Sequence, residues 1–218
     1  MGSRGMRSYS YTANTLGFKN NETLKEALGE KGDEMSPHEA MSGANPFFDK
    51  RYEEFSGNCQ RCVVAYELRR RGYDVTAQAT FDNDKLPYRV DRFNSDGSQN
   101  SYWMGAFKNT KPIVVGTVNY QTRKEGIDKT ISNIEKQMIN FGEGSRAIIQ
   151  FKTSKTGHVF SVENVKGVIT YMDPQVGKYV VINKMLEDAV IPRTQIIRTD
   201  NLRISERAKD CVTARKRR

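Results

Sequence analysis

Three residues whose side chains support nucleophilic catalysis occur in a suggestive order along the chain: Cys59, His158 and Asp173. A cysteine thiolate is a nucleophile, a histidine is its usual base, and a carboxylate can hold the imidazole in its working tautomer. The chain has only two histidines, so any imidazole chemistry depends on His38 or His158. His38 lies in a polar segment and is expected to be solvated. His158 follows a glycine at the start of a predicted strand, which leaves one side of the ring accessible, as a general base requires.

The thiol belongs to a Cys-x-x-Cys pair, Cys59 and Cys62, that directly follows Asn58. Asparagine is a favourable helix N-cap, and apolar residues then keep helical spacing up to Gly72, which predicts a helix over 59–71. A helix N-terminus stabilises a thiolate and offers free N–H groups to an oxyanion. This favours Cys59 as the nucleophile. Cys62 lies one turn later and is expected to pack against a sheet, although the sequence leaves it open as the nucleophile.

The same pair of cysteines also suggests a metal or redox site. A zinc site needs four ligands, and beyond this pair only Cys211 and two isolated histidines remain. A thioredoxin-like motif would lie in a βαβ unit, which the pattern does not show. Three cysteines are too few, and odd in number, for a disulfide scaffold, which favours a reducing compartment. We expect no metal and no organic cofactor.

The histidine and the aspartate lie in a series of short segments rich in β-branched and aromatic residues and separated by glycine or proline. These segments are RAIIQFK (146–152), HVFSVEN (158–164), GVITYM (167–172) and KYVVI (178–182). They predict an antiparallel meander. In a hairpin of the second and third segments, the start of one strand lies beside the end of the other, which places Asp173 next to His158.

Two further residues are candidates for oxyanion stabilisation or substrate orientation: Gln175, two residues after Asp173, and Asn58 before the helix. Trp103, the only tryptophan, is expected in the core or, with Tyr102, in a pocket wall.

Helices over 59–71 and 124–141, followed by an antiparallel sheet, predict an α+β fold. We divide the chain into a loosely structured N-terminal extension (1–45), a catalytic domain (46–205) and a basic C-terminal tail (206–218). Residues 81–102 are rich in Asp, Asn, Ser and Gly, which is typical of a long surface loop.

The formal net charge of +9 raises the possibility of an anionic partner. The basic residues are spread along the chain rather than clustered, so nucleic-acid binding is not favoured. No run of about 18 apolar residues occurs, so we expect no membrane span. The N-terminus also lacks the apolar core of a signal peptide.

Several segments together resemble the papain-fold toxin domains of bacterial polymorphic toxins and phage head-associated proteins, the toxin glutamine deamidase family. The segments are NCQRCVVAYELRRRGYDVTA, GEGSRAIIQF, GHVFSVENVKG, YMDPQVGK and, more weakly, RTDNL. They span about residues 45–205. The resemblance implies a papain-like cysteine hydrolase fold with a catalytic helix packed on an antiparallel sheet. It also implies that the catalytic residues are Cys59, His158 and Asp173.

The resemblance further implies a protein glutamine deamidase that acts as a toxin or effector on a protein substrate in the cytoplasm of a target cell. Such a protein would be delivered by secretion or by a phage. A cognate immunity protein would be a further partner. The same machinery could serve a cysteine protease or a transglutaminase-like enzyme, since pocket shape and water access separate these reactions. A non-enzymatic phage virion-associated or nucleic-acid-binding module is the alternative from another class.

Overall fold

The computed structural model describes residues 23–80, 92–93 and 99–215 of the chain. Its helices are α2 (Leu24–Leu28), α3 (Pro37–Ala44), α4 (Glu53–Ser56), α5 (Cys59–Arg70), α6 (Arg123–Phe141) and α7 (Ile182–Met185), with the 3₁₀ helices η1 (Tyr102–Ala106), η2 (Ile191–Arg193) and η3 (Glu206–Asp210). Its strands are β1 (Val75–Ala77), β2 (Arg92–Phe93), β3 (Gln99–Asn100), β4 (Ile113–Val114), β5 (Arg146–Lys152), β6 (Gly157–Val165), β7 (Val168–Asp173), β8 (Lys178–Tyr179), β9 (Gln195–Arg198) and β10 (Val212–Ala214). This mixture of helices and antiparallel strands confirms the predicted α+β class. The loop predicted over 81–102 lies mostly outside the described residues.

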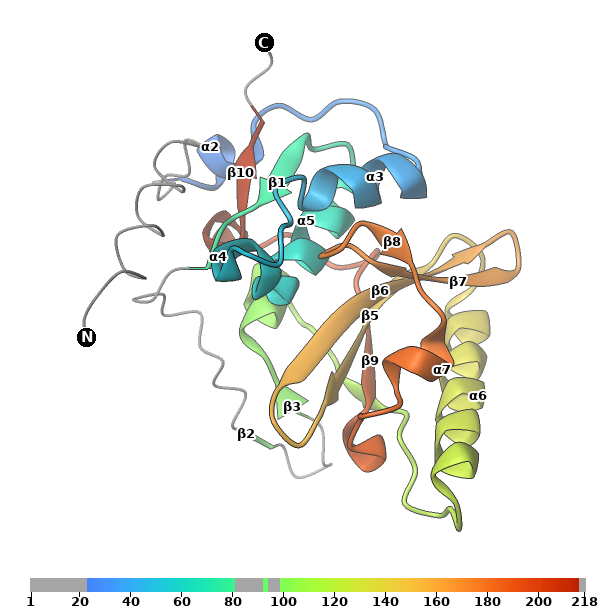
Figure 1. Ribbon diagram of the computed structural model, residues 1–218. Helices are drawn as coiled ribbons and strands as arrows, with labels where there is room; N and C mark the ends of the chain where they lie inside the picture. The colour runs from blue at the N-terminus through green and yellow to red at the C-terminus, as the bar shows by residue number, and fades with distance from the viewer. Residues whose placement is uncertain (1–22, 81–91, 94–98, 216–218) are drawn as a thin grey trace, which may run out of the picture.

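The centre of the fold is an antiparallel sheet in the order β4-β9-β5-β6-β7-β8, with α5 and α6 on opposite faces (Figure 1). Successive side chains of a strand point to opposite faces. In β5, Ile148 therefore joins the core cluster that contains α5, whereas Ile149 joins the cluster that contains α6. Both faces of the sheet are covered by a helix.

The β6–β7 hairpin has a continuous antiparallel register in which Ser161 is paired with Met172. Continuing that register by one position sets Asp173 opposite Phe160. Because residues two apart on a strand share a face, Asp173 is a same-face diagonal neighbour of His158. Local pairing therefore brings the two predicted site residues together.

The segment before residue 45 is ordered over its described part, so the prediction of a loose extension is wrong for Leu24–Ala44. α2 and α3 each begin with a capping box, through Thr23 and Ser36. Both helices bury apolar side chains in the core cluster of α5. The sequence does carry the start signals of both helices, at Thr23 and at Ser36-Pro37, but its polar composition concealed that the few apolar residues of each helix join the core.

The C-terminal segment is also part of the fold, so the predicted tail does not begin at residue 206. β10 pairs antiparallel with β1, with Thr213 opposite Thr76. Ala208, Cys211 and Val212 are buried in the α5 core cluster. The basic composition of this segment obscured its three core residues, whose burial depends on a partner strand more than 130 residues away.

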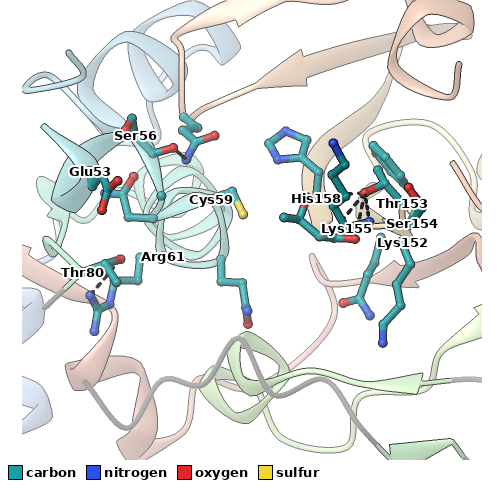
Figure 2. A pocket seen from close by; sticks show the side chains of 18 of the residues that line it. Glu53, Ser56, Cys59, Arg61, Thr80, Lys152, Thr153, Ser154, Lys155 and His158 are labelled. Carbon is teal, nitrogen blue, oxygen red and sulfur yellow. Dashed lines mark hydrogen bonds between the residues drawn. The ribbon is translucent and has the colours of Figure 1, made fainter. Parts of the chain in front are cut away.

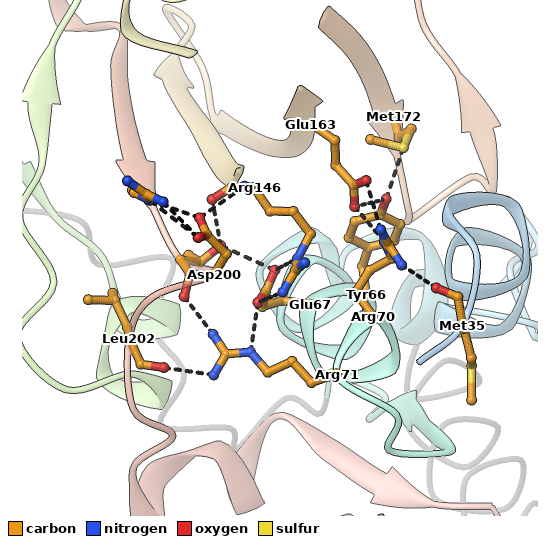
Figure 3. A network of polar contacts seen from close by, with 12 residues as sticks. Met35, Tyr66, Glu67, Arg70, Arg71, Arg146, Glu163, Met172, Asp200 and Leu202 are labelled. Carbon is orange, nitrogen blue, oxygen red and sulfur yellow. Dashed lines mark hydrogen bonds and ion pairs between the residues drawn. The ribbon is translucent and has the colours of Figure 1, made fainter. Parts of the chain in front are cut away.

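Two buried carboxylates attach α5 to the sheet (Figure 3). Glu67 accepts hydrogen bonds from Arg71 Nε at 2.7 Å and Arg146 Nε at 2.9 Å. Glu163, on β6, accepts one from Arg70 Nε at 2.7 Å. Each carboxylate is only 2% exposed, and an unpaired charge at such depth is strongly destabilising. The network therefore holds α5 in one position against β5 and β6.

Among the described residues, no helix combines the length and the apolar character needed to cross a membrane.

Candidate active site

His158 and Asp173 are in direct contact at the open end of the β6–β7 hairpin. His158 Nε2 lies 2.9 Å from Asp173 Oδ2. The other carboxylate oxygen, Oδ1, accepts a hydrogen bond from the backbone N–H of Gln175 at 3.0 Å. Asp173 is buried, so this second bond fixes the carboxylate, which in turn holds the imidazole in one orientation. The predicted proximity of His158 and Asp173 is confirmed.

The surroundings of His158 favour its protonated form. Burial by itself lowers the pKa of this imidazole, but hydrogen bonds with Asp173 and Cys59, together with their charges, outweigh burial and raise the pKa to about 10. Since Asp173 occupies Nε2, the nitrogen left for the Cys59 thiol is Nδ1. His158 is therefore held between a carboxylate and a thiol, and the imidazolium can stabilise a thiolate.

Cys59 is the first residue of α5 and is partly exposed. The backbone N–H groups of Cys59 and Gln60 have no acceptor among the residues that the structure describes. Free N–H groups at the start of a twelve-residue helix attract negative charge, both on a thiolate and on an oxyanion. In Figure 2 the sulfur of Cys59 is directed toward the side of the pocket where His158 stands.

The two sides of the site enclose a cleft of about 860 Å³. One wall is the start of α5 with the turn before it, including Ser56, Cys59 and Gln60. The opposite wall is the β5–β6 hairpin from Gln150 to His158 (Figure 2). A cleft of this size can admit a side chain and the chain segment that carries it.

Cys62 occupies a different environment from Cys59. It is 0% exposed, lies in the core cluster, and its thiol donates a hydrogen bond to Asn58 Oδ1 at 3.1 Å. Burial, followed by the nearby Cys59 and Asp173, raises the pKa of the Cys62 thiol well above its ordinary value. As predicted, Cys62 is a packed residue, and the thiol that faces the cleft is Cys59.

Asn58 occupies the N-cap position of α5, as predicted, but its side chain makes no capping hydrogen bond. Its Nδ2 donates to the carbonyl of Gln78 at 3.1 Å and to Asn45 Oδ1 at 3.4 Å. Its Oδ1 accepts from Cys62. Its amide hydrogens are thus used inside the protein, where they fix the turn before Cys59, and Asn58 also belongs to the residues that line the cleft described above.

Gln175 lines the cleft, and it is supported by Asn45, a residue that no sequence motif singles out. Gln175 Nε2 donates to the carbonyl of Ser56 at 2.8 Å. Asn45 Nδ2 donates to the carbonyls of Gln175 and Phe55, both at 2.9 Å. These bonds join the turn after β7 to the turn before α5, and so join the two halves of the site. An asparagine before a proline looks like an ordinary turn residue, and nothing local in the sequence marks its partners.

The other histidine, His38, is exposed on α3 and takes no part in the site. Within the described residues, no group of three or more His, Cys, Asp or Glu side chains is placed to hold a metal ion.

A thiol at a helix start that faces a sheet-borne His–Asp pair is the arrangement of papain-like proteins. A model of the family described as papain fold toxin 1, glutamine deamidase, matches residues 57–178, more than half of the chain. The chain belongs to this family, and the matched region contains the start of α5 and the whole β6–β7 hairpin. Searches among curated proteins and among solved structures gave no match.

Proposed function

We propose that the protein is a cysteine-dependent glutamine deamidase that acts on a protein substrate through Cys59, His158 and Asp173. The observation that carries the proposal is the arrangement of these residues. Cys59 and His158 line one cleft, and Asp173 lies behind the imidazole at 2.9 Å. Membership of a glutamine deamidase family supports the choice of reaction.

The chemistry follows from this arrangement. The Cys59 thiolate attacks the side-chain carboxamide carbon of a glutamine, and the carbonyl oxygen takes up the negative charge. The C–N bond then breaks, and His158 donates a proton to the departing ammonia. Water, deprotonated by the now neutral imidazole, attacks the resulting thioester. The products are glutamate and the regenerated thiolate–imidazolium pair.

The free N–H groups of Cys59 and Gln60 stabilise the oxyanion in this scheme. Gln175 assists by holding Ser56 and thereby the turn before the helix. Asn58 is a positioning residue because its amide is committed to partners inside the protein.

A role as a toxin or effector accompanies the proposed reaction. By the family resemblance, the substrate is a protein in the cytoplasm of a target cell, and a cognate immunity protein would protect the producing cell. Secretion and phage delivery are both compatible with this role.

The proposal is tested by incubating the purified chain with native cell extracts and analysing all proteins by mass spectrometry. Deamidation increases the mass of a target glutamine by about one dalton without new chain ends. The parent should produce this change at defined glutamines, and Cys59→Ala should not. New chain ends would instead show a protease, and glutamine–lysine cross-links a transglutaminase-like enzyme. No Cys59-dependent change of any kind would contradict an enzymatic function.

A further inference from the structure

Trp103, in η1, is completely buried and uses both of its N–H groups to hold glutamine side chains. Its indole Nε1 donates to Gln150 Oε1 at 2.9 Å. Its backbone N–H donates to Gln60 Oε1 at 3.3 Å. An indole N–H and a backbone N–H can only donate, so the amide atom that faces each of them is the oxygen. The orientation of both amides is therefore fixed by chemistry.

With each oxygen turned toward Trp103, each NH₂ group must point elsewhere. Among the described residues, Nε2 of Gln60 and Nε2 of Gln150 donate no hydrogen bond. Neither nitrogen belongs to the fully buried polar atoms that lack a partner, so both nitrogens are accessible from outside the protein. Both residues line the cleft that contains Cys59 and His158. The two NH₂ groups are thus oriented donors with access to the site.

Gln150 has an unusual position for a polar side chain. It lies on β5, in the middle of the sheet, where it is paired with Val159 and Gln195, and it is only 5% exposed. It lies on the same face as Ile148, the face that α5 covers. A polar group at such a position is unfavourable unless all its hydrogen-bonding atoms find partners. Trp103 satisfies the oxygen and leaves the nitrogen for a ligand.

We propose that Gln60 and Gln150, oriented by Trp103, form a subsite that binds carbonyl oxygens of the substrate. The ligand chemistry is an amide carbonyl, because two neutral N–H donors match a neutral acceptor. That carbonyl belongs either to the amide that Cys59 attacks or to the main chain beside it. This inference rests on the proposed function in one respect only: it takes Cys59 as the group that reacts with the substrate.

The test measures how fast Cys59 reacts with thiol reagents, by alkylation or by disulfide exchange, and requires no turnover. Three reagents are compared: iodoacetamide, iodoacetyl-tetraalanine amide and 2,2′-dithiodipyridine, which has no carbonyl. The variants are Gln150→Glu and Gln60→Glu, in which the carboxylate still accepts from Trp103 but the NH₂ donor is lost. Gln150→Met removes the donor without adding charge. Gln121→Glu, exposed before α6 and outside the cleft, is the matched control. Cys59→Ser gives the background rate.

We expect each cleft variant to slow alkylation by at least one iodoacetyl reagent by about tenfold, the effect of a lost hydrogen bond. The reaction with dithiodipyridine should stay within about twofold of the parent, and Gln121→Glu should match the parent throughout. A loss with both iodoacetyl reagents assigns the subsite to the reacting amide, whereas a loss with the peptide reagent alone assigns it to the main chain.

Unchanged rates with every reagent would overturn the proposal. An equal decrease in the reaction rate with all three reagents would also overturn it, because it would reflect a change in the thiol itself. The same holds for a decrease in the Glu variants that Gln150→Met does not share, because the added charge would then be the cause. If Gln150→Glu does not fold, Gln60→Glu still decides, because Gln60 is partly exposed near a helix N-terminus where an acidic residue is favourable. Normal alkylation in an enzyme that deamidates would refute only the subsite. Selective losses in a chain without deamidase activity would refute only the proposed function.

Discussion

His158 Nε2 and Asp173 Oδ2 lie 2.9 Å apart, although the two residues stand on different strands. The hairpin register creates this contact, and the backbone N–H of Gln175 fixes the far oxygen of the carboxylate. One nitrogen of the imidazole is therefore committed to Asp173. The other is directed to the only thiol that faces the cleft among the described residues, that of Cys59.

The first prediction concerns the protonation of His158. In a His38→Ala background, NMR titration follows a single imidazole, and we expect it to stay protonated until the pH approaches about 10. Asp173→Asn removes the carboxylate that favours the imidazolium, so the pKa should fall by at least one unit. A pKa unchanged by Asp173→Asn would show that the contact does not control the charge of the ring.

The same shift predicts how stability depends on pH. The pKa of His158 is raised from 6.5 in the unfolded chain to about 10 in the folded protein. The folded state therefore binds this proton more tightly, and its stabilisation is fully present below pH 6.5 and lost as the pH rises to about 10. The free energies of unfolding of the parent and of Asp173→Asn, measured in urea, should differ most at the low-pH end of this window. They should converge near pH 10. A difference that grows with rising pH would contradict the sign.

The second prediction separates the two cysteines. Cys59→Ala should reduce kcat by at least about a thousandfold, because it removes the nucleophile, with little change in the free energy of unfolding. Cys62→Ala should keep measurable activity but lower the free energy of unfolding by about 1–2 kcal/mol, because it leaves a small cavity in the core. Activity assays and urea unfolding measure both effects. Full activity of Cys59→Ala would refute the assignment of the nucleophile.

The third prediction concerns Asn45 as a positioning residue. Asn45→Ala removes the bonds that join the turn before α5 to the turn after β7, so Cys59 and His158 should lose their alignment. We expect kcat to fall about tenfold with KM nearly unchanged, and the free energy of unfolding to fall by about 2 kcal/mol.

Asn133→Ala is the matched control for Asn45→Ala. Asn133, on α6, donates to the carbonyl of Val115 at 3.0 Å and lies outside the cleft. Asn133→Ala should lower the free energy of unfolding by about 1 kcal/mol without a change in kcat. If Asn45→Ala alters kcat no more than Asn133→Ala does, Asn45 has only a structural role.

The fourth prediction concerns the buried network behind α5. Glu67→Gln keeps the shape of the side chain but leaves Arg71 and Arg146 without their shared carboxylate. Breaking a buried ion pair by removing one partner should lower the free energy of unfolding by about 3 kcal/mol. Asp128→Asn breaks the exposed pair with Lys124 and should change stability by less than about 0.5 kcal/mol. Equal effects of the two substitutions in urea unfolding would contradict this view of the network.

Much of the local structure follows from the sequence alone. The helix that begins at Cys59 and the hairpin that contains His158 show in the periodicity of apolar residues, because local spacing determines which face of a helix or strand is buried. The pairing of His158 with Asp173 could be predicted for the same reason, since a short hairpin allows few registers.

Only the tertiary structure decided which residues meet across the cleft. Which of the two thiols, Cys59 or Cys62, is exposed depends on packing around α5, and the hydrogen bonds of Asn45 and Trp103 reach partners 130 and 47 residues away. The core strand at the C-terminus was missed for the same reason. Burial and the identity of a hydrogen-bond partner are set by the packing of distant segments. The sequence by itself determined the reactive groups and their local elements, whereas long-range packing determined which of those groups face one another.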